Sequence, residues 1–122
     1  MALTQKRLAG PSAIENTASA TTLPASGNYT YEVPASTTTI VKQIMLTNTA
    51  GEPASMTMWI KPSATAYASL TNGNIIYYDF VVESNSTTLL NLSLVLAQGD
   101  KIYVRASGAG AINITMSGLE ES

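Results

Sequence analysis

Residues 90–105 read Leu-Asn-Leu-Ser-Leu-Val-Leu-Ala-Gln-Gly-Asp-Lys-Ile-Tyr-Val-Arg. Apolar and polar side chains alternate over residues 90–94 and again over residues 101–105, and a period of two is typical of a β-strand with one buried face. Between the two runs, Gln98-Gly99-Asp100 has the composition of a turn. This stretch therefore predicts two strands separated by a tight turn.

The same pattern continues on both sides of this stretch. Further strands are predicted at 29–33, 38–47, 55–60, 75–82 and 112–117. Residues 63–72 are predicted to form a loop or one helical turn. About seven or eight strands and no convincing helix predict an all-β fold, namely an antiparallel β-sandwich of the Ig-like or jelly-roll type. The Cys…Trp…Cys spacing of true immunoglobulin domains is absent, because the chain has no cysteine.

Strand 38–47 contains a cation on an apolar face. Strict alternation puts Ile40, Ile44 and Leu46 on one side, and Lys42 falls on that same side. A lysine at such a position predicts either a rim location or a β-bulge. In the last strand, the residues predicted to point inward are Ile112, Ile114 and Met116.

Strand 75–82 is apolar on both faces, which predicts a strand covered on both sides. Alternation places Asp79 on the face of Ile75, Tyr77 and Val81. A buried aspartate is costly unless it is hydrogen-bonded. We therefore expect Asp79 at the polar rim of a sheet or opposite an arginine across an interface.

Residues 1–28 differ in composition from the rest of the chain. They are small and polar, and their apolar residues follow neither a period of two nor one of 3.6. We interpret residues 1–28 as an extended N-terminal arm and residues 29–122 as the β-sandwich domain. The arm either lies along a neighbouring subunit or folds back onto its own domain.

Composition excludes several classes of function. The 122 residues include no histidine and no cysteine, so ordinary zinc, haem and iron–sulfur sites and Ser-His or Cys-His nucleophile pairs are ruled out. Charged residues make up 11% of the chain, against about 25% in ordinary domains. The net charge of −2 argues against nucleic-acid binding. No segment has the length of a membrane span and no signal peptide is expected, so we expect no membrane partner and synthesis in a cytoplasm.

Few residues remain that are able to carry catalysis. A carboxylate pair of Asp79 with Asp100 or Glu83 is conceivable for glycoside cleavage, but these residues are better explained by turns and sheet rims. No loop has the dense Asp/Asn spacing of a calcium site. The sequence therefore predicts a protein that is not an enzyme and that needs no cofactor or metal.

Aromatic residues are the more suggestive surface candidates. Alternation points Trp59 and Tyr103 outward from their strands. Exposed aromatic rings serve as interface anchors or stack on sugar rings. The alternative is that cross-strand aromatic pairs simply brace the sheet.

Several stretches resemble small virion structural proteins of tailed bacteriophages. They are Lys6-Arg7-Leu8-Ala9-Gly10-Pro11, Tyr31-Glu32-Val33-Pro34-Ala35, Ile40-Val41-Lys42-Gln43-Ile44 with Thr47-Asn48-Thr49, Leu94-Val95-Leu96-Ala97-Gln98-Gly99-Asp100-Lys101-Ile102-Tyr103-Val104, and Ile112-Asn113-Ile114-Thr115-Met116-Ser117-Gly118-Leu119-Glu120. The resemblance implies a β-sandwich structural protein of the virion, such as a capsid decoration (cement) protein, or a tail, neck or fibre component. It also implies that the partners are the major capsid protein or other virion proteins, together with further copies of the chain.

On this interpretation, the N-terminal arm supplies the contacts with the particle. Lys6 and Arg7 would meet an acidic capsid surface, and Leu3 and Leu8 would fill apolar pockets. A competing interpretation is a carbohydrate-binding module for host adhesion that uses Trp59 and the tyrosines to bind host surface glycans.

Overall fold

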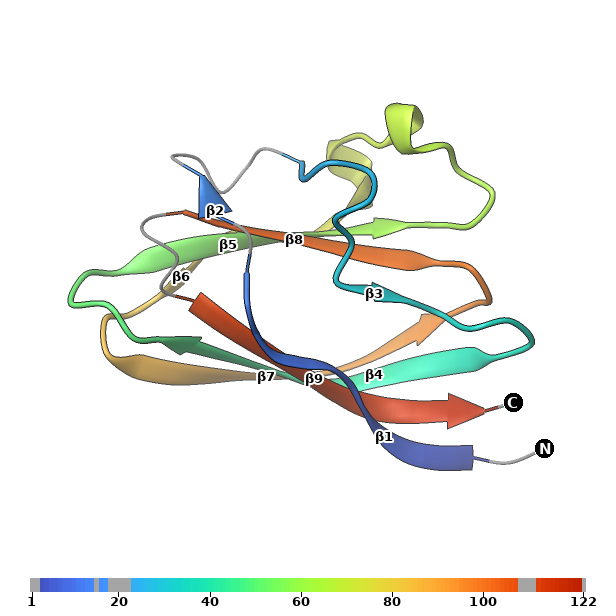
Figure 1. Ribbon diagram of the computed structural model, residues 1–122, viewed down its shortest axis with the longest axis horizontal. Coiled ribbons are helices and arrows are strands. Elements are labelled where there is room, and N and C mark those ends of the chain that lie inside the picture. The colour runs from blue at the N-terminus through green and yellow to red at the C-terminus, as the bar shows by residue number, and fades with distance from the viewer. Residues whose placement is uncertain (1–2, 15, 18–22, 108–111, 122) are drawn as a thin grey trace.

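Two β-sheets face each other in the computed structural model, which describes residues 3–14, 16–17, 23–107 and 112–121 (Figure 1). The described elements are β1 (Leu3–Ala13), β2 (Asn16–Thr17), β3 (Tyr31–Glu32), β4 (Thr38–Asn48), β5 (Ala54–Lys61), the 3-10 turns η1 (Tyr67–Ser69) and η2 (Asn72–Asn74), β6 (Ile75–Val82), β7 (Ser86–Leu96), β8 (Lys101–Ser107) and β9 (Ile112–Glu121). The all-β sandwich predicted from the alternating stretches is confirmed.

The strand order identifies the sandwich as a jelly roll. One sheet runs β1-β9-β4-β7, and the other runs β2-β8-β5-β6 with β3 also paired to β8. The pairs are therefore nested: β1 with β9, β2 and β3 with β8, β4 with β7, and β5 with β6. All are antiparallel except the two-residue pairing of β2 with β8. Such nested pairing is the topology of a jelly roll rather than an Ig-like sandwich.

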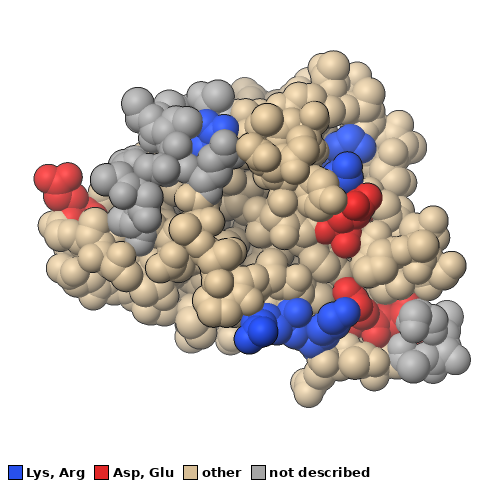
Figure 2. Space-filling view, viewed as in Figure 1, with Lys and Arg blue, Asp and Glu red and all other residues tan. Residues whose placement is uncertain are grey.

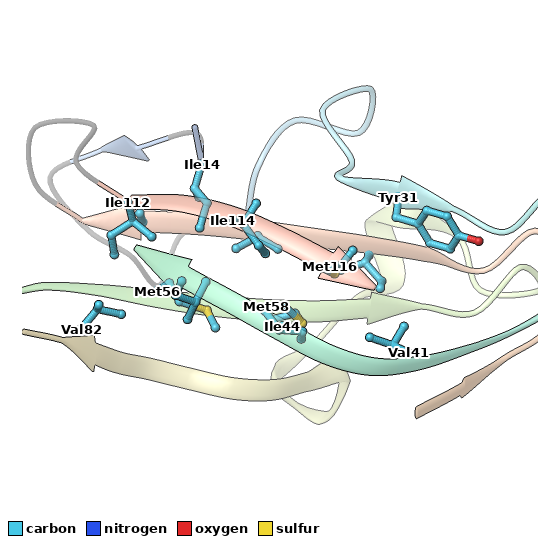
Figure 3. Packing of buried hydrophobic residues seen from close by; sticks show 14 of the residues in the cluster. Ile14, Tyr31, Val41, Ile44, Met56, Met58, Val82, Ile112, Ile114 and Met116 are labelled. Carbon is cyan, nitrogen blue, oxygen red and sulfur yellow. The ribbon is translucent and has the colours of Figure 1, made fainter. Parts of the chain in front are cut away.

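The core fills the space between the sheets with side chains from alternate positions (Figure 3). β9 contributes Ile112, Ile114 and Met116, as their alternation predicts, and β5 contributes Met56 and Met58. All five are at most 1% exposed. Burying each such side chain stabilises the fold by about 1.5–3 kcal/mol.

A β-bulge at Lys42 determines which side chains of β4 face the core. The pairings of β4 with both neighbours skip a position between Val41 and Gln43, so the predicted bulge is confirmed. The bulge shifts the alternation by one residue. Val41 rather than Ile40 therefore joins Ile44 in the core, and Lys42 is exposed.

β1 is the edge strand of the first sheet, where it pairs with β9 from Leu3 opposite Glu121 to Ala13 opposite Asn113. Gly10 permits this approach: its φ is +75°, and a Cβ there would lie 2.0 Å from the carbonyl oxygen of Ile114. Residues 3–13 therefore belong to the sandwich rather than to a separate arm, because this segment folds back onto its own domain. The predicted boundary at residue 28 does not hold for them.

β6 is also an edge strand, and one of its faces is exposed at Ile76, Tyr78 and Val81, which corrects the prediction that both its faces are covered. Asp79 has a φ of +50°, and the pairing with β5 shifts around it. The shift breaks the alternation, so Tyr77 and Phe80 point toward the core while Asp79 and Val81 do not. The prediction that Tyr77, Asp79 and Val81 share a face is wrong for this reason.

Candidate interaction surface at the β1 edge

The open edge of β1 brings together three of the six residues predicted to contact a partner. In the part of the chain that the structure describes, β1 has β9 as its single neighbour in the sheet. The main-chain N–H and C=O groups on the opposite side of an edge strand are available to another chain. Leu3, Lys6 and Arg7 all lie on this strand and are exposed.

Three cations line a shallow groove beside this edge. Lys6 and Arg7 from β1 and Lys42 from β4 border a hollow of about 470 Å³, together with Gln5, Ser117, Gly118 and Leu119. Figure 2 shows basic side chains gathered over the region of β1, with acidic side chains next to them near the C-terminus. Half of the six lysine and arginine residues thus line one groove in a chain whose net charge is −2.

The three cations differ in how they are held. Lys6 Nζ lies 3.1 Å from Glu120 Oε1 in an ion pair, and Lys42 Nζ donates to Ser93 Oγ at 3.0 Å. Arg7 has no ion-pair partner among the described residues. Its guanidinium carries five N–H donors in a fork that fits a carboxylate, so Arg7 is the best placed of the three to bind an acidic group of a partner.

A partly buried hydrogen-bond network fixes the first half of β1 to the sandwich. The Tyr31 hydroxyl of β3 donates to Glu120 Oε2 at 2.5 Å, and the hydroxyl oxygens of Tyr31 and Thr39 lie 2.8 Å apart. Because Tyr31 gives its single proton to Glu120, Thr39 donates to Tyr31. Lys6, Glu120, Tyr31 and Thr39 therefore connect β1, β9 and β4 of one sheet with β3 of the other.

The same network shifts two pKa values. The hydrogen bond from Tyr31, assisted by Lys6, holds the pKa of Glu120 below its ordinary value. Burial of the Tyr31 hydroxyl, together with its hydrogen bond to the Glu120 carboxylate, raises the pKa of Tyr31 above its ordinary range. Glu120 is therefore ionised and Tyr31 is neutral at neutral pH, which is the protonation state that this network needs.

The leucines predicted for the interface have different environments. Leu3 is 60% exposed and is free to contact a partner. Leu8 is half-buried and packs against the core of its own domain. The structure therefore supports Leu3 but not Leu8 as an exposed apolar contact.

Trp59 and Tyr103 are buried, which corrects their prediction as surface residues. They lie opposite each other on the outer face of the β5–β8 sheet, at 4% and 1% exposure. Residues 23–29 and η1 cover them (Figure 1): the Tyr103 hydroxyl donates to Ser26 O at 2.7 Å, and the Tyr67 hydroxyl donates to Pro24 O.

The rings of Tyr29 and Tyr67 pack edge-on against Tyr103 with ring centroids 6.5 and 5.8 Å apart. The aromatic cluster therefore braces the covering segments, and a glycan has no access to Trp59 or Tyr103. Alternation correctly gave the direction of these side chains, but it carries no signal for the segments that lie over them.

Five of the seven residues that line the groove were not predicted as site residues, among them Lys42 and Gly118. Lys42 was singled out for its bulge alone, and the register of β4, β9 and β1 is what places it beside Arg7. Gly118 lines the floor, where a Cβ would lie 2.0 Å from the carbonyl oxygen of Ile40. The sequence signal for Lys42 was a cation in an otherwise apolar strand.

Two of the three carboxylates considered for catalysis, those of Asp79 and Asp100, accept hydrogen bonds from nearby groups. Asp100 accepts hydrogen bonds from the backbone N–H groups of Ser63 and Ala97, and Asp79 accepts one from Ser55 Oγ at 2.6 Å. Within the described ranges, no three His, Cys, Asp or Glu side chains are grouped so as to hold a metal ion. The helical turns of this same part of the chain are too short to cross a membrane.

Comparison of the chain with protein-family models, curated proteins and solved structures finds no match.

Proposed function

We propose that this chain is a non-enzymatic structural protein of a tailed-bacteriophage virion, and that it decorates the outer surface of the capsid through its β1 edge. The observation that carries this proposal is the groove of Lys6, Arg7 and Lys42 beside an open strand edge. The resemblance of the N-terminal and C-terminal stretches to small phage virion proteins supports the same assignment.

The β1 edge suits attachment to an acidic protein surface. Its cations attract carboxylates over about 10 Å at moderate salt, and its exposed main chain offers hydrogen bonds to an extended segment of the partner. The sandwich behind the edge is a packed core, so the bound protein would join neighbouring capsid subunits as a stiff body. Many such weak contacts around a shell act together through their effective concentration.

Charge reversal in the groove tests this proposal. Particles that lack the protein would be mixed with the full chain carrying Arg7→Glu and Lys42→Glu, which leaves the Lys6–Glu120 ion pair in place. We expect at least a tenfold loss of particle affinity, because two attractions become repulsions. The matched control is Lys61→Glu with Lys101→Glu, which makes the same change in net charge away from the groove.

Particle occupancy and copy number are the measurements. Retention of full occupancy by the folded Arg7→Glu, Lys42→Glu chain would contradict docking through the groove. A copy number of hundreds per particle is expected for a shell protein. A handful of copies would overturn capsid decoration in favour of a tail, neck or fibre component.

A further inference from the structure

The side of the sandwich opposite β1 is apolar and open. Six of the eight exposed large apolar side chains among the described residues lie on β6, β7 and the adjoining strand β4: Met45, Ile76, Tyr78, Val81, Leu89 and Val95. Between the two edge strands is a hollow of about 260 Å³ that is lined by Ile76, Tyr77, Leu92, Ser93 and Leu94. Met45, Leu89 and Val95 lie on the outer face of one sheet, and Ile76, Tyr78 and Val81 lie on the outer face of the other, so exposed apolar side chains flank the hollow on both sides. Exposed apolar groups gathered in this way mark a contact with another protein.

Among the described edge strands, β7 is the least protected, with one register shift against β4 as its single irregularity. Natural edge strands are usually blunted by charge, proline, a bulge or short length. β1 has Lys6, Arg7 and Pro11, β6 is bent at Asp79, and β2 and β3 are two residues each. β7 has 11 residues, and the sequence of Ser86–Leu96 contains no charged residue, no proline and no glycine. Its free main-chain edge is suited to pair with another extended strand.

The chemistry of β7 points to a second copy of the chain as that strand. In a two-fold contact each surface meets itself, so a surface with charges of one sign would repel its own copy. β7 brings no such repulsion. Antiparallel pairing of two full-length β7 strands places Asn91, the central residue of Ser86–Leu96, opposite its own copy on the two-fold axis. A side-chain amide carries both a donor and an acceptor, so Asn91 is able to hydrogen-bond to another Asn91.

The same register pairs apolar groups from the two copies. Leu90 of one copy lies opposite Leu92 of the other, and both side chains are half-buried in the single chain. Contact between them would cover the side chains that line the hollow beside β6. We infer that two copies of this chain associate through antiparallel pairing of their β7 strands, which joins their four-stranded sheets into one sheet of eight strands with a β1 edge at each end.

Cysteine crosslinking tests both the surface and the register. The native chain has no cysteine, so Asn91→Cys introduces a single thiol. Opposed residues of an antiparallel pair have Cα atoms about 4.5–5.5 Å apart, a separation that a disulfide spans. We expect mild oxidation to link most of the Asn91→Cys chains into covalent dimers. The matched control is Asn72→Cys, an exposed asparagine of η2.

Sedimentation of the free protein gives a second, independent readout. The wild-type chain should have twice the mass of one copy, and Asn91→Asp should raise the dimer dissociation constant at least tenfold, whereas Asn72→Asp leaves it unchanged. Mixing Asn91→Asp with Asn91→Lys should restore dimers, because opposite charges then meet on the axis.

A wild-type chain that remains monomeric up to its solubility limit would overturn the inference. So would a dimer that neither crosslinks through Asn91→Cys nor weakens with Asn91→Asp, because such a dimer uses another surface. Both experiments use the free protein without particles, so their outcome is separate from the test of capsid binding.

Discussion

The two open edges of the first sheet, β1 and β7, differ in charge and in how regular their pairing is. On the β1 side, the edge carries Lys6, Arg7 and Pro11, the pairing with β9 shifts register twice, and a hydrogen-bond network ties both sheets together. On the β7 side, the edge is 11 uncharged residues whose pairing with β4 shifts register once, flanked by exposed apolar side chains. The difference indicates that the chain resists self-pairing at one edge and permits it at the other.

Removing the protected edge should have the largest effect. Deletion of residues 1–13 takes away a full-length strand and the packing of Leu8 and Ala9 against the core, and it leaves β9 as a new edge. We expect the free energy of unfolding to fall by about 3 kcal/mol or more, from lost apolar burial and strand hydrogen bonds.

The chain that lacks residues 1–13 should also self-associate through β9, because β9 would then be an open edge like β7. Chemical denaturation and sedimentation, both in the Asn91→Asp background, measure the two effects. Stability equal to that of the full chain would show that β1 is not an integral strand.

Removing the Tyr31 hydroxyl from the hydrogen-bond network on the β1 side should have an intermediate effect on the free energy of unfolding. Tyr31→Phe removes the hydroxyl that Glu120 and Thr39 share, so a mostly buried carboxylate loses its shortest hydrogen bond. The expected loss of unfolding free energy is about 1–3 kcal/mol. Tyr78→Phe on the β7 side is the control: the tyrosine is 63% exposed, and its change should cost less than about 0.5 kcal/mol. Equal losses in the two variants would contradict the role of the network.

Lowering the pH should have the smallest effect, and it should act on the β1 side and not on the β7 side. The pKa of Glu120 is lower in the folded chain than its ordinary value of 4.5, so the unfolded chain binds more protons in this range. The stability that Glu120 contributes is therefore present above about pH 4.5 and is lost as the pH falls through the lower folded pKa. Glu120→Gln should flatten this part of the profile.

The dimer dissociation constant, measured over the same pH range, is the comparison for the unfolding free energy. Residues 86–96 contain no titratable side chain, so the dimer dissociation constant should stay nearly constant while unfolding free energy declines. A dimer that dissociates in step with the protonation of Glu120 would show that the two sides are coupled.

The strands were predictable from the sequence where alternation is unbroken. β6 matches its predicted range of 75–82, and the inward residues of β9 are those predicted. The prediction of which side chains face the core failed where the backbone departs from regular extension. Asp79 at a φ of +50° reverses the pattern within β6, and two register shifts remove the period of two from β1, so that strand looked like an arm.

The candidate site was predictable only in part, for a related reason. Lys6 and Arg7 stand out as adjacent cations in a sparsely charged chain. Lys42 joins them through the register of β1, β9 and β4, which are far apart in sequence. Trp59 and Tyr103 were assigned to the surface because period-two patterns distinguish the two faces of a sheet but do not indicate which segments cover the outer one.

The pairing of Leu3 with Glu121 brings the start of β1 and the end of β9 together at one corner of the sandwich (Figure 1). A short linker is therefore sufficient to close the chain into a ring. New termini opened in the exposed turn at residues 51–53, between β4 and β5, would leave every strand pair of the jelly roll intact. The order of the strands along the chain is thus separable from their order in space, and a circularly permuted protein should carry both edges unchanged.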